Sequence, residues 1–511
     1  MATKTLSELR MCSLSAHIRQ KPNWWEKMRD ETIRSKWIRD SEAKEQQAEH
    51  PRWEQLTDNM DRSMGHILSL SAFSLIQCSL QSGPYERIFL SDTLIPEDLT
   101  TALELAVKLL EDVPESDRDC HPGSDGRVLG LVHPSICPLV FYETWGTDDD
   151  GKVTTFKAPE SCDVDISFLF ISERFQWLPS DFSINKDGAV KALLESPYIN
   201  NISPNHHDAL VPVIEQVMQC AVPLWERVLS SLRNDPVPAR VIRTATDGIP
   251  CIWSGGAKKL LDSADETHRD QDYDGWLEGR LNSGSLVLPE AHAEYRDMLK
   301  GDLTVTLSNS PTIVLTPEKP EYPGGIWHVE GMATESIVST FVYYYESDNI
   351  EGGATRLWDS PSEMSQRRRI EQDDSMCIKI LYGMRRDEPC IQDSGSVETK
   401  AGRSIAFPNL YQHRVSPFKL SDPTKPGLRK ILVFFLVDPT VRILSATNIP
   451  PQQLKTVKHT LRSQGPSSRL SFLPVELLDY IATGLVPGVK SRAQAEVNVE
   501  TEFFEREFNM W

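Results

Sequence analysis

The run Trp327-His328-Val329-Glu330-Gly331 precedes a second run, Ile337-Val338-Ser339-Thr340-Phe341-Val342-Tyr343-Tyr344-Tyr345, and together they decide the fold that we expect. The second run is rich in the β-branched and aromatic residues that strands favour. In a strand, side chains two residues apart point to the same face, so His328 and Glu330 would present an imidazole and a carboxylate side by side. The stretch therefore predicts a β-structured core that carries two ligands of one metal ion.

A third ligand has to come from another strand, and the run Asn409-Leu410-Tyr411-Gln412-His413-Arg414-Val415 offers His413. Two histidines and one carboxylate on one face of an octahedral metal leave three coordination positions open. This is the arrangement of non-haem Fe(II) oxygenases, in which the open positions take a bidentate co-substrate and oxygen. His328, Glu330 and His413 are accordingly the candidate metal ligands and catalytic residues.

Short β-rich runs follow one another from about residue 300 onward, separated by Gly, Pro and acidic clusters. The candidate strands lie at 303–307, 312–316, 326–332, 336–346, 354–358, 376–382, 403–407 and 429–437. Their number and spacing are typical of an all-β sandwich or barrel of jelly-roll type.

Helical patterns flank this β-rich part on both sides. Residues 97–112 carry apolar side chains on one stripe, and residues 207–233 repeat that pattern. Residues 22–48 and the tail from residue 451 are also helix-prone. We therefore expect three parts, which are a mostly helical N-terminal region over 1–295, a core over 296–445 and a helical C-terminal cap over 446–511.

Further motifs around the candidate ligands extend the pattern. Glu351-Gly352-Gly353-Ala354-Thr355-Arg356 follows the Tyr-rich run, Gly402 to Pro408 precedes His413, and Val415, Pro417, Gly427 and Arg429 come after it. With these motifs, residues 312–438 resemble the 2-oxoglutarate- and Fe(II)-dependent dioxygenases, in particular the prolyl-hydroxylase-like branch. The whole chain also looks like a fungal family, named only as a domain of unknown function, whose members carry this oxygenase core. Asn23-Trp24-Trp25, Phe175-Gln176-Trp177-Leu178-Pro179 and Tyr198-Ile199-Asn200-Asn201 are among the stretches similar to that family.

The resemblance implies an α+β fold with a double-stranded β-helix (jelly-roll) core inside helical flanks. It matches His328, Glu330 and His413 to the iron ligands, although Asp is commoner than Glu at the middle position. It also matches Arg429 to the residue that pairs with the distal carboxylate of 2-oxoglutarate, a role that suits the fork of a guanidinium. Tyr344 matches a tyrosine whose hydroxyl binds the same carboxylate.

Two of these assignments have alternatives. Tyr343 and Tyr345 point to the opposite face from Tyr344, and a shift of one residue in register would exchange them. Arg414 or Lys430 could hold the carboxylate of the co-substrate in place of Arg429.

The resemblance implies an enzyme that oxidises, and in most cases hydroxylates, a substrate C–H bond with Fe(II) as cofactor, 2-oxoglutarate as co-substrate and O2. A small molecule, such as an amino acid or a fungal specialised metabolite, is the expected substrate, and a protein side chain is the alternative. Two other classes compete. One is a non-catalytic interaction protein on the same scaffold, and the other is a cupin-type enzyme that uses metal without 2-oxoglutarate.

The composition argues against several other classes of partner. The 511 residues include 54 Lys or Arg and 74 Asp or Glu, a net charge of −20 that would repel nucleic acid and anionic lipid. No apolar run approaches the roughly 20 residues that a membrane helix needs. Nine scattered cysteines and an N-terminus without a secretory pattern predict a reduced, cytoplasmic protein without structural disulfides.

Overall fold

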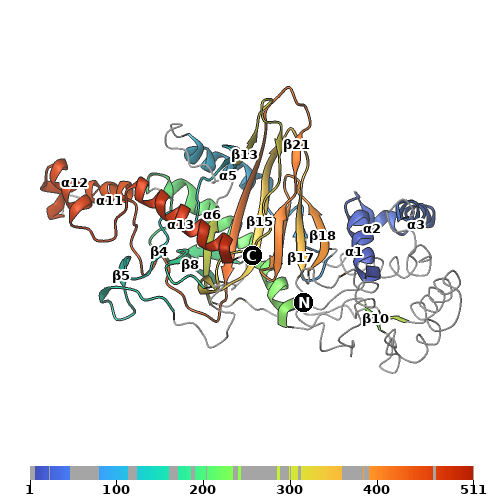
Figure 1. Cartoon of the computed structure of the whole chain (residues 1–511), viewed down its shortest axis with the longest axis horizontal. Coiled ribbons are helices and arrows are strands. Elements are labelled where there is room, and N and C mark those ends of the chain that lie inside the picture. Colours follow the sequence, from blue (N-terminus) through green and yellow to red (C-terminus); the bar gives the residue numbers. More distant parts are fainter. Residues whose placement is uncertain are drawn as a thin grey trace, which may run out of the picture.

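The structure of this chain is a computed structural model, shown in Figure 1. It describes residues 6–21, 23–45, 80–83, 85–112, 124–159, 171–185, 190–202, 204–233, 240–242, 285–287, 299, 301–308, 312–359, 384, 391–463 and 468–509. Within these residues the fold is a mixture of helices and mostly antiparallel strands.

A ten-stranded antiparallel sheet, which we call the large sheet, forms the centre of the molecule. In spatial order its main path is β1 (Gln81–Ser82), β2 (Phe89–Ser91), β19 (Ser404–Pro408), β15 (Ile337–Asp348), β22 (Gly427–Val437), β12 (Gly301–Ser308), β8 (Ser180–Asn185) and β9 (Lys191–Leu194). β13 (Thr312–Leu315) pairs with β22 and with β3 (Val128–Leu129). The long strands β15 and β22 pair along most of their length and form the centre of this sheet.

A three-stranded sheet, which we call the small sheet, packs on one face of the large sheet. It consists of β18 (Gln392–Glu398), β17 (Ala354–Asp359) and β20 (Tyr411–Val415). One buried cluster joins Leu357, Val397 and Tyr411 of the small sheet to Tyr344 and Val433 of the large sheet. The space between the two sheets is therefore an apolar core, and we call the large-sheet face that lines it the inner face. Near it, β14 (Glu321–Tyr322), β21 (Phe418–Leu420) and β16 (Ile350–Gly352) form another antiparallel sheet.

Helices cover the opposite, outer face of the large sheet. α6 (Pro204–Arg233) runs across this face, and α5 (Glu97–Glu111) packs against α6 and β15 (Figure 1). Their apolar residues share a core cluster with Phe341, Tyr343 and Tyr345 of β15. Because side chains alternate along a strand, Tyr344 points to the inner face, between the sheets, and its two tyrosine neighbours point to the helices.

The remaining elements lie around this core. They are α1 (Leu6–Arg19), α2 (Trp24–Lys27), α3 (Glu31–Glu45), the pair β4 (Leu139–Val140) and β7 (Phe175–Gln176), the pair β5 (Trp145–Thr147) and β6 (Val153–Thr155), and the pair β10 (Arg240–Ile242) and β11 (Ser285–Val287). The C-terminal part adds α11 (Leu454–Arg462), the short 3-10 helix η5 (Arg469–Phe472), α12 (Val475–Gly484) and α13 (Arg492–Asn509). A second short 3-10 helix, η4 (Ala333–Glu335), precedes β15. None of the described helices is both long and apolar enough to span a membrane.

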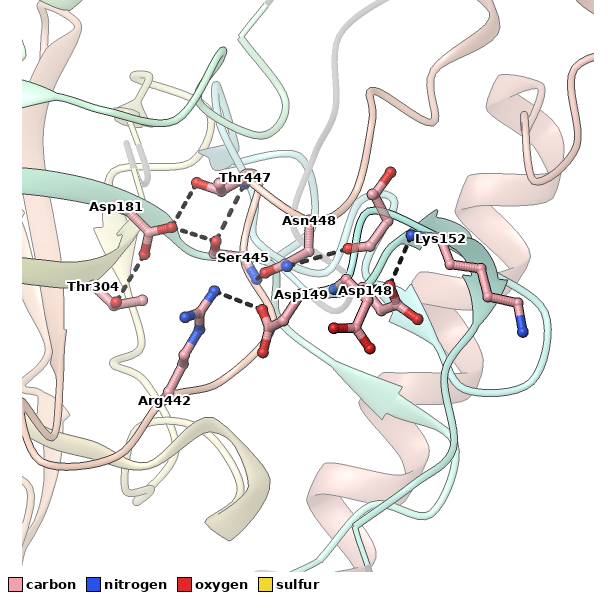
Figure 2. Close-up of polar contacts among 11 residues, drawn as sticks. Asp148, Asp149, Lys152, Asp181, Thr304, Arg442, Ser445, Thr447 and Asn448 are labelled. Atoms are coloured by element: carbon pink, nitrogen blue, oxygen red, sulfur yellow. Dashed lines mark hydrogen bonds and ion pairs between the residues drawn. The ribbon is translucent and has the colours of Figure 1, made fainter.

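One carboxylate of the large sheet binds side chains of the segment that follows β22. Asp181 of β8 accepts hydrogen bonds from the hydroxyls of Thr304, Ser445 and Thr447. Figure 2 shows these hydroxyls gathered around the carboxylate, with the pair of Asp149 and Arg442 nearby. The contacts join β8, β12 and the chain that follows β22.

Most predicted elements that fall on described residues are confirmed. The helices expected at 97–112 and 207–233 are α5 and α6, and the tail after residue 451 is helical. The strand expected at 326–332 is wrong, because only His328 forms a single bridge there and the chain turns at Gly331 into η4. The strand expected at 376–382 lies outside the described residues.

The part of the chain before residue 296 contains strands as well as helices. β2, β8 and β9 belong to the same large sheet as strands that follow residue 300. The division at residues 295 and 446 stays a prediction.

Among the nine cysteines, Cys12, Cys137 and Cys220 carry free thiols.

Candidate metal centre

The two candidate histidines face each other across one β-bridge. His413 is the third residue of β20, and His328 lies on the segment that passes beside it. The main-chain N–H of each residue donates to the carbonyl of the other, with N···O distances of 3.1 and 2.8 Å. This pairing brings the imidazole centroids to 4.4 Å from each other.

Glu330 places its carboxylate beside these two imidazoles. Its Oε1 lies 3.1 Å from Nε2 of His413 and 3.6 Å from Nε2 of His328. One ligand atom from each of the three side chains lies within 4.8 Å of the others. The structure thus brings together the three residues predicted from the sequence. No other group of His, Cys, Asp and Glu within the described ranges gathers in this way.

Backbone carbonyls orient both imidazoles. Nδ1 of His328 lies 2.9 Å from the carbonyl oxygen of Ile326, and Nδ1 of His413 lies 3.5 Å from that of Tyr411. A carbonyl can only accept, so in the tautomer in which each Nδ1 donates to its carbonyl, each Nε2 of a neutral ring presents its lone pair to the site. Histidines that bind metals are oriented in this way by a hydrogen bond from the other ring nitrogen.

The electrostatics of Glu330 and His413 favour the forms that bind a metal, whereas those of His328 favour its protonated form. Burial alone would raise the pKa of the Glu330 carboxyl, but hydrogen bonds and charge from His328 and His413 outweigh it and hold this pKa at about 2. Burial, together with the neighbouring His328, lowers the pKa of His413. Burial opposes a charged His328, yet Glu330 raises the pKa of that imidazole overall.

At neutral pH the site therefore holds a carboxylate and at least one neutral imidazole. The lone pairs of Nε2 in His413 and of the Glu330 carboxylate face each other at 3.1 Å. Two acceptors at this distance need a positive charge between or beside them, supplied by a proton or by a cation. His328 and His413 offer nitrogen and Glu330 offers oxygen, and this donor set fits a divalent transition metal such as iron.

Arg429 lies on β22 with a side chain that is almost completely buried. Its Nη2 donates to the carbonyl of Gly352 at 3.0 Å, while Nε and Nη1 are buried without a hydrogen-bond partner. The guanidinium also lies 4.3 Å from the ring centroid of Phe418. Burial lowers the pKa of Arg429 from its usual value, but the group stays charged at physiological pH. A buried cation with two unused donors fits the carboxylate of a ligand.

Tyr344 lies on the inner face, as expected, and its hydroxyl bonds the hydroxyl of Thr355 at 2.7 Å. Thr355 is two residues before Leu357, which pairs with His413 across β17 and β20. Thr355 therefore lies two strand residues, or roughly 7 Å, along the sheet from the position paired with His413. A five-carbon dicarboxylate can bridge this separation. Arg429 and Tyr344 are close enough for the guanidinium to affect the pKa of the phenol, which burial raises above its usual value.

The structure separates Arg429 from the two alternative basic residues. Lys430 points to the outer face, where its Nζ binds Glu111 at 2.9 Å and Glu346 at 3.0 Å. Arg414 stacks its guanidinium over the ring of Trp327 at 4.7 Å, and Trp327 in turn stacks on Trp358. Neither side chain shares the inner face with Tyr344.

Two polar residues that contact the candidate site residues were not predicted. Thr355 belongs to the Gly352-Gly353-Ala354-Thr355 motif, but its hydroxyl bond to Tyr344 depends on the pairing of two sheets. Asn409 stands four residues before His413, and its side-chain amide contacts the main chain of Glu330. The sequence feature that could have indicated Asn409 is its position in a turn between two strands.

Comparisons with known proteins identify the family. The family model described as "Protein of unknown function (DUF4246)" matches residues 72–460, and "Domain of unknown function DUF4246, N-terminal" matches residues 1–40. The chain therefore belongs to the DUF4246 family. The fungal origin that the sequence suggested stays a prediction.

Among solved structures, the chain is similar to the selenomethionine-labelled Fe(II)/(alpha)ketoglutarate-dependent dioxygenase TqaL, with 17% sequence identity and a TM-score of 0.18. The likeness covers 34% of this chain and 57% of that chain, so it spans little more than half of that structure. No curated protein matches the sequence.

Proposed function

We propose that this member of the DUF4246 family is an Fe(II)- and 2-oxoglutarate-dependent dioxygenase that oxidises a C–H bond of a small molecule. The observation that carries the proposal is the convergence of His328, Glu330 and His413, whose ligand atoms lie within 4.8 Å of one another. Two imidazoles and one carboxylate form the set that non-haem Fe(II) oxygenases use. A jelly-roll core belongs to the same proposal, and the packing of the small sheet on the large sheet supports it.

His328, Glu330 and His413 would hold the iron. When bound, the iron would supply oxygen activation coupled to oxidative decarboxylation of 2-oxoglutarate. The chain contributes the setting for this chemistry. The backbone carbonyls keep both Nε2 lone pairs directed at the site, and the ring of Phe407, 4.9 Å from that of His413, shields that imidazole from water.

Arg429 and Tyr344 would bind the distal carboxylate of 2-oxoglutarate. The two buried N–H groups of Arg429 that lack a partner support this role, because a buried donor without an acceptor costs about 1–3 kcal/mol. They also favour a carboxylate co-substrate over the metal-only, cupin-type alternative. An amino acid or a specialised metabolite is the proposed substrate, and a protein side chain remains the second candidate.

The test is the formation of succinate from 2-oxoglutarate by the purified full chain with Fe(II), with and without candidate metabolites. Glu330→Ala should abolish succinate formation, because it removes one of three protein bonds to the metal. Glu496→Ala, which removes an exposed carboxylate on α13, is the matched control and should leave the rate unchanged. Full turnover by Glu330→Ala, or no succinate from wild type under any condition, would refute the proposal.

A further inference from the structure

Asn409 lies in the turn between β19 and β20, where the chain crosses from the large sheet to the small sheet. Its Oδ1 accepts a hydrogen bond from the main-chain N–H of Glu330 at 2.9 Å. Its Nδ2 donates to the carbonyl of Glu330 at 2.7 Å and to that of Ile337 at 3.2 Å. One amide thus satisfies both main-chain polar groups of the candidate ligand Glu330.

These bonds replace a backbone pairing that is missing. The bridge between His328 and His413 would, if it continued as an antiparallel ladder, pair Glu330 with Tyr411. The ladder stops after the one bridge, because Gly331 adopts a left-handed conformation with φ of 68° and turns the chain away. The amide of Asn409 resembles a peptide group in both its acceptor and its donors, so it can take the place of the absent strand.

Asn409 is also fixed from its own side. Its main-chain N–H donates to the carbonyl of Val338 at 3.0 Å, and Ile337, which its side chain contacts, opens β15. The residue therefore connects Glu330 to the first residues of β15 and to the start of β20. His413 lies on β20, four residues after Asn409. The relative positions of the two ligands depend on this one turn.

We infer that Asn409 is a positioning residue that sets the affinity of the site for its metal by holding Glu330 against His413. This inference rests on the proposed function. Asn409 does not touch the metal position itself, since its amide is occupied by the main chain of Glu330 and Ile337. Residues that orient a metal ligand typically change metal affinity by about 10- to 100-fold when they are replaced.

The experiment titrates Co(II) into the full-length protein without 2-oxoglutarate and follows the d–d absorption of the bound metal. Asn409→Ala should weaken Co(II) binding by about 10- to 100-fold. Asn409→Asp keeps the shape and the acceptor but loses both donors and sets a negative charge against two carbonyls, so it should weaken binding at least as much. At saturating metal, the KM for 2-oxoglutarate should stay within about twofold of wild type.

Asn448→Ala is the matched control. The amide of Asn448 also bridges main-chain groups, accepting from Ser445 and donating to Thr147, in the region that Figure 2 shows. It should lower the melting temperature as much as the Asn409 variants but leave Co(II) affinity unchanged. If Asn409→Ala does not fold, the Co(II) affinity of Asn409→Asp decides the test.

Two outcomes would overturn the inference in distinguishable ways. If wild type binds Co(II) and both Asn409 variants bind it within about threefold of wild type, the metal centre stands and the role of Asn409 is wrong. If wild type binds no Co(II), the metal centre itself fails and the role of Asn409 falls with it.

Discussion

Two buried arginines in or beside strands of the large sheet differ in how their guanidinium groups are satisfied. Arg403, which directly precedes β19, forms a two-pronged ion pair with Asp92, with distances of 2.6 and 3.0 Å. Arg429 of β22 keeps Nε and Nη1 buried without an acceptor. A buried charge is normally paired, so the guanidinium of Arg403 is satisfied within the fold, whereas that of Arg429 keeps two donors that an anionic ligand could use.

Arg429→Ala should raise the KM for 2-oxoglutarate by roughly 10²- to 10⁴-fold, because a carboxylate bound away from water would lose its partner at a cost of about 3–5 kcal/mol. Co(II) affinity should stay nearly unchanged, since Arg429 is not among the three candidate ligands. Arg429→Lys should recover part of the loss, because it keeps the charge but not the fork. Steady-state kinetics with 2-oxoglutarate as the varied substrate measure the effect. Equal KM values in wild type and Arg429→Ala would show that the carboxylate binds elsewhere.

Asp92 should make the stability of the protein depend on acid pH. Burial alone would raise the pKa of its carboxyl, but Arg403 and Lys400 outweigh burial and hold that pKa below its usual value. A carboxyl whose pKa is lowered by folding contributes stability above its ordinary pKa, near 4, and loses that contribution as the pH falls through its lower folded pKa. Asp92→Asn should therefore melt at a lower temperature than wild type at pH 7, and the difference should shrink below pH ~4.

The exposed pair Arg442 and Asp149 is the control for this measurement. Surface ion pairs contribute little to stability, so Asp149→Asn should melt like wild type over the whole pH range. A gap between Asp92→Asn and wild type that stays constant as the pH falls well below the ordinary carboxyl pKa would contradict the assignment.

At the scale of elements, the link between β16 and β17 depends on two adjacent glycines. Gly352 and Gly353 both have positive φ angles, of 80° and 91°, which side chains other than glycine rarely adopt. Their surroundings differ. A Cβ on Gly352 would meet no atom within 4 Å, but a Cβ on Gly353 would overlap Nη1 of Arg429.

Gly353→Ala should therefore displace the guanidinium of Arg429 and raise the KM for 2-oxoglutarate, whereas Gly352→Ala should not. Both variants should lose about 1 kcal/mol or more of stability, because alanine is strained at positive φ. Urea unfolding and co-substrate kinetics, measured on the pair, separate backbone strain from displacement of Arg429. An equal rise in KM for both variants would mean that strain alone, not the contact with Arg429, is responsible.

Local patterns were sufficient to predict the long elements, and together with the family resemblance they singled out the three residues that the structure brings together. α5, α6, β15 and β22 have strong signals in the sequence, whereas the spacing of His328 and Glu330 indicated one metal site only together with the flanking motifs and the family resemblance. The strand expected at 326–332 was wrong because the left-handed turn at Gly331 and the carbonyl contacts of Asn409 override the strand propensity of its residues. β18 was not predicted because its sequence contains several polar residues and a glycine, and β21 was not predicted because it has only three residues.

At the scale of the whole molecule, the large sheet could not be predicted because its strands come from both sides of residue 296. β8 pairs with β12, and β2 pairs with β19, over distances in sequence that no local pattern reveals. The contacts of the Asp181 carboxylate could not be predicted for the same reason, because they join β8 to Thr304 and to the segment with Ser445 and Thr447 (Figure 2).

Asp181→Ala should lower the free energy of unfolding by roughly 2–4 kcal/mol, because hydrogen bonds to a charged acceptor are stronger than neutral ones and three hydroxyls lose theirs. It should also speed proteolytic cleavage after β22, since the C-terminal segment would lose its hydroxyl contacts with β8. Chemical unfolding and limited proteolysis, with Asp149→Ala as the exposed control, measure both effects. If Asp181→Ala unfolds at the same urea concentration as wild type, the three hydroxyl contacts do not contribute to the stability of the protein.

The pairing of β2 with β19 has a consequence for synthesis of the protein. Ser91 and Ser404 are partners in the sheet but stand 404 − 91 = 313 positions apart in the chain. Contacts this distant form slowly, and a ribosome releases the N-terminal partner long before the C-terminal one. A nascent chain that has not yet reached residue 437 lacks the central strand of the sheet. It would present open strand edges to chaperones and proteases, so the capacity to bind a metal would arise only after residue 437 has been synthesised.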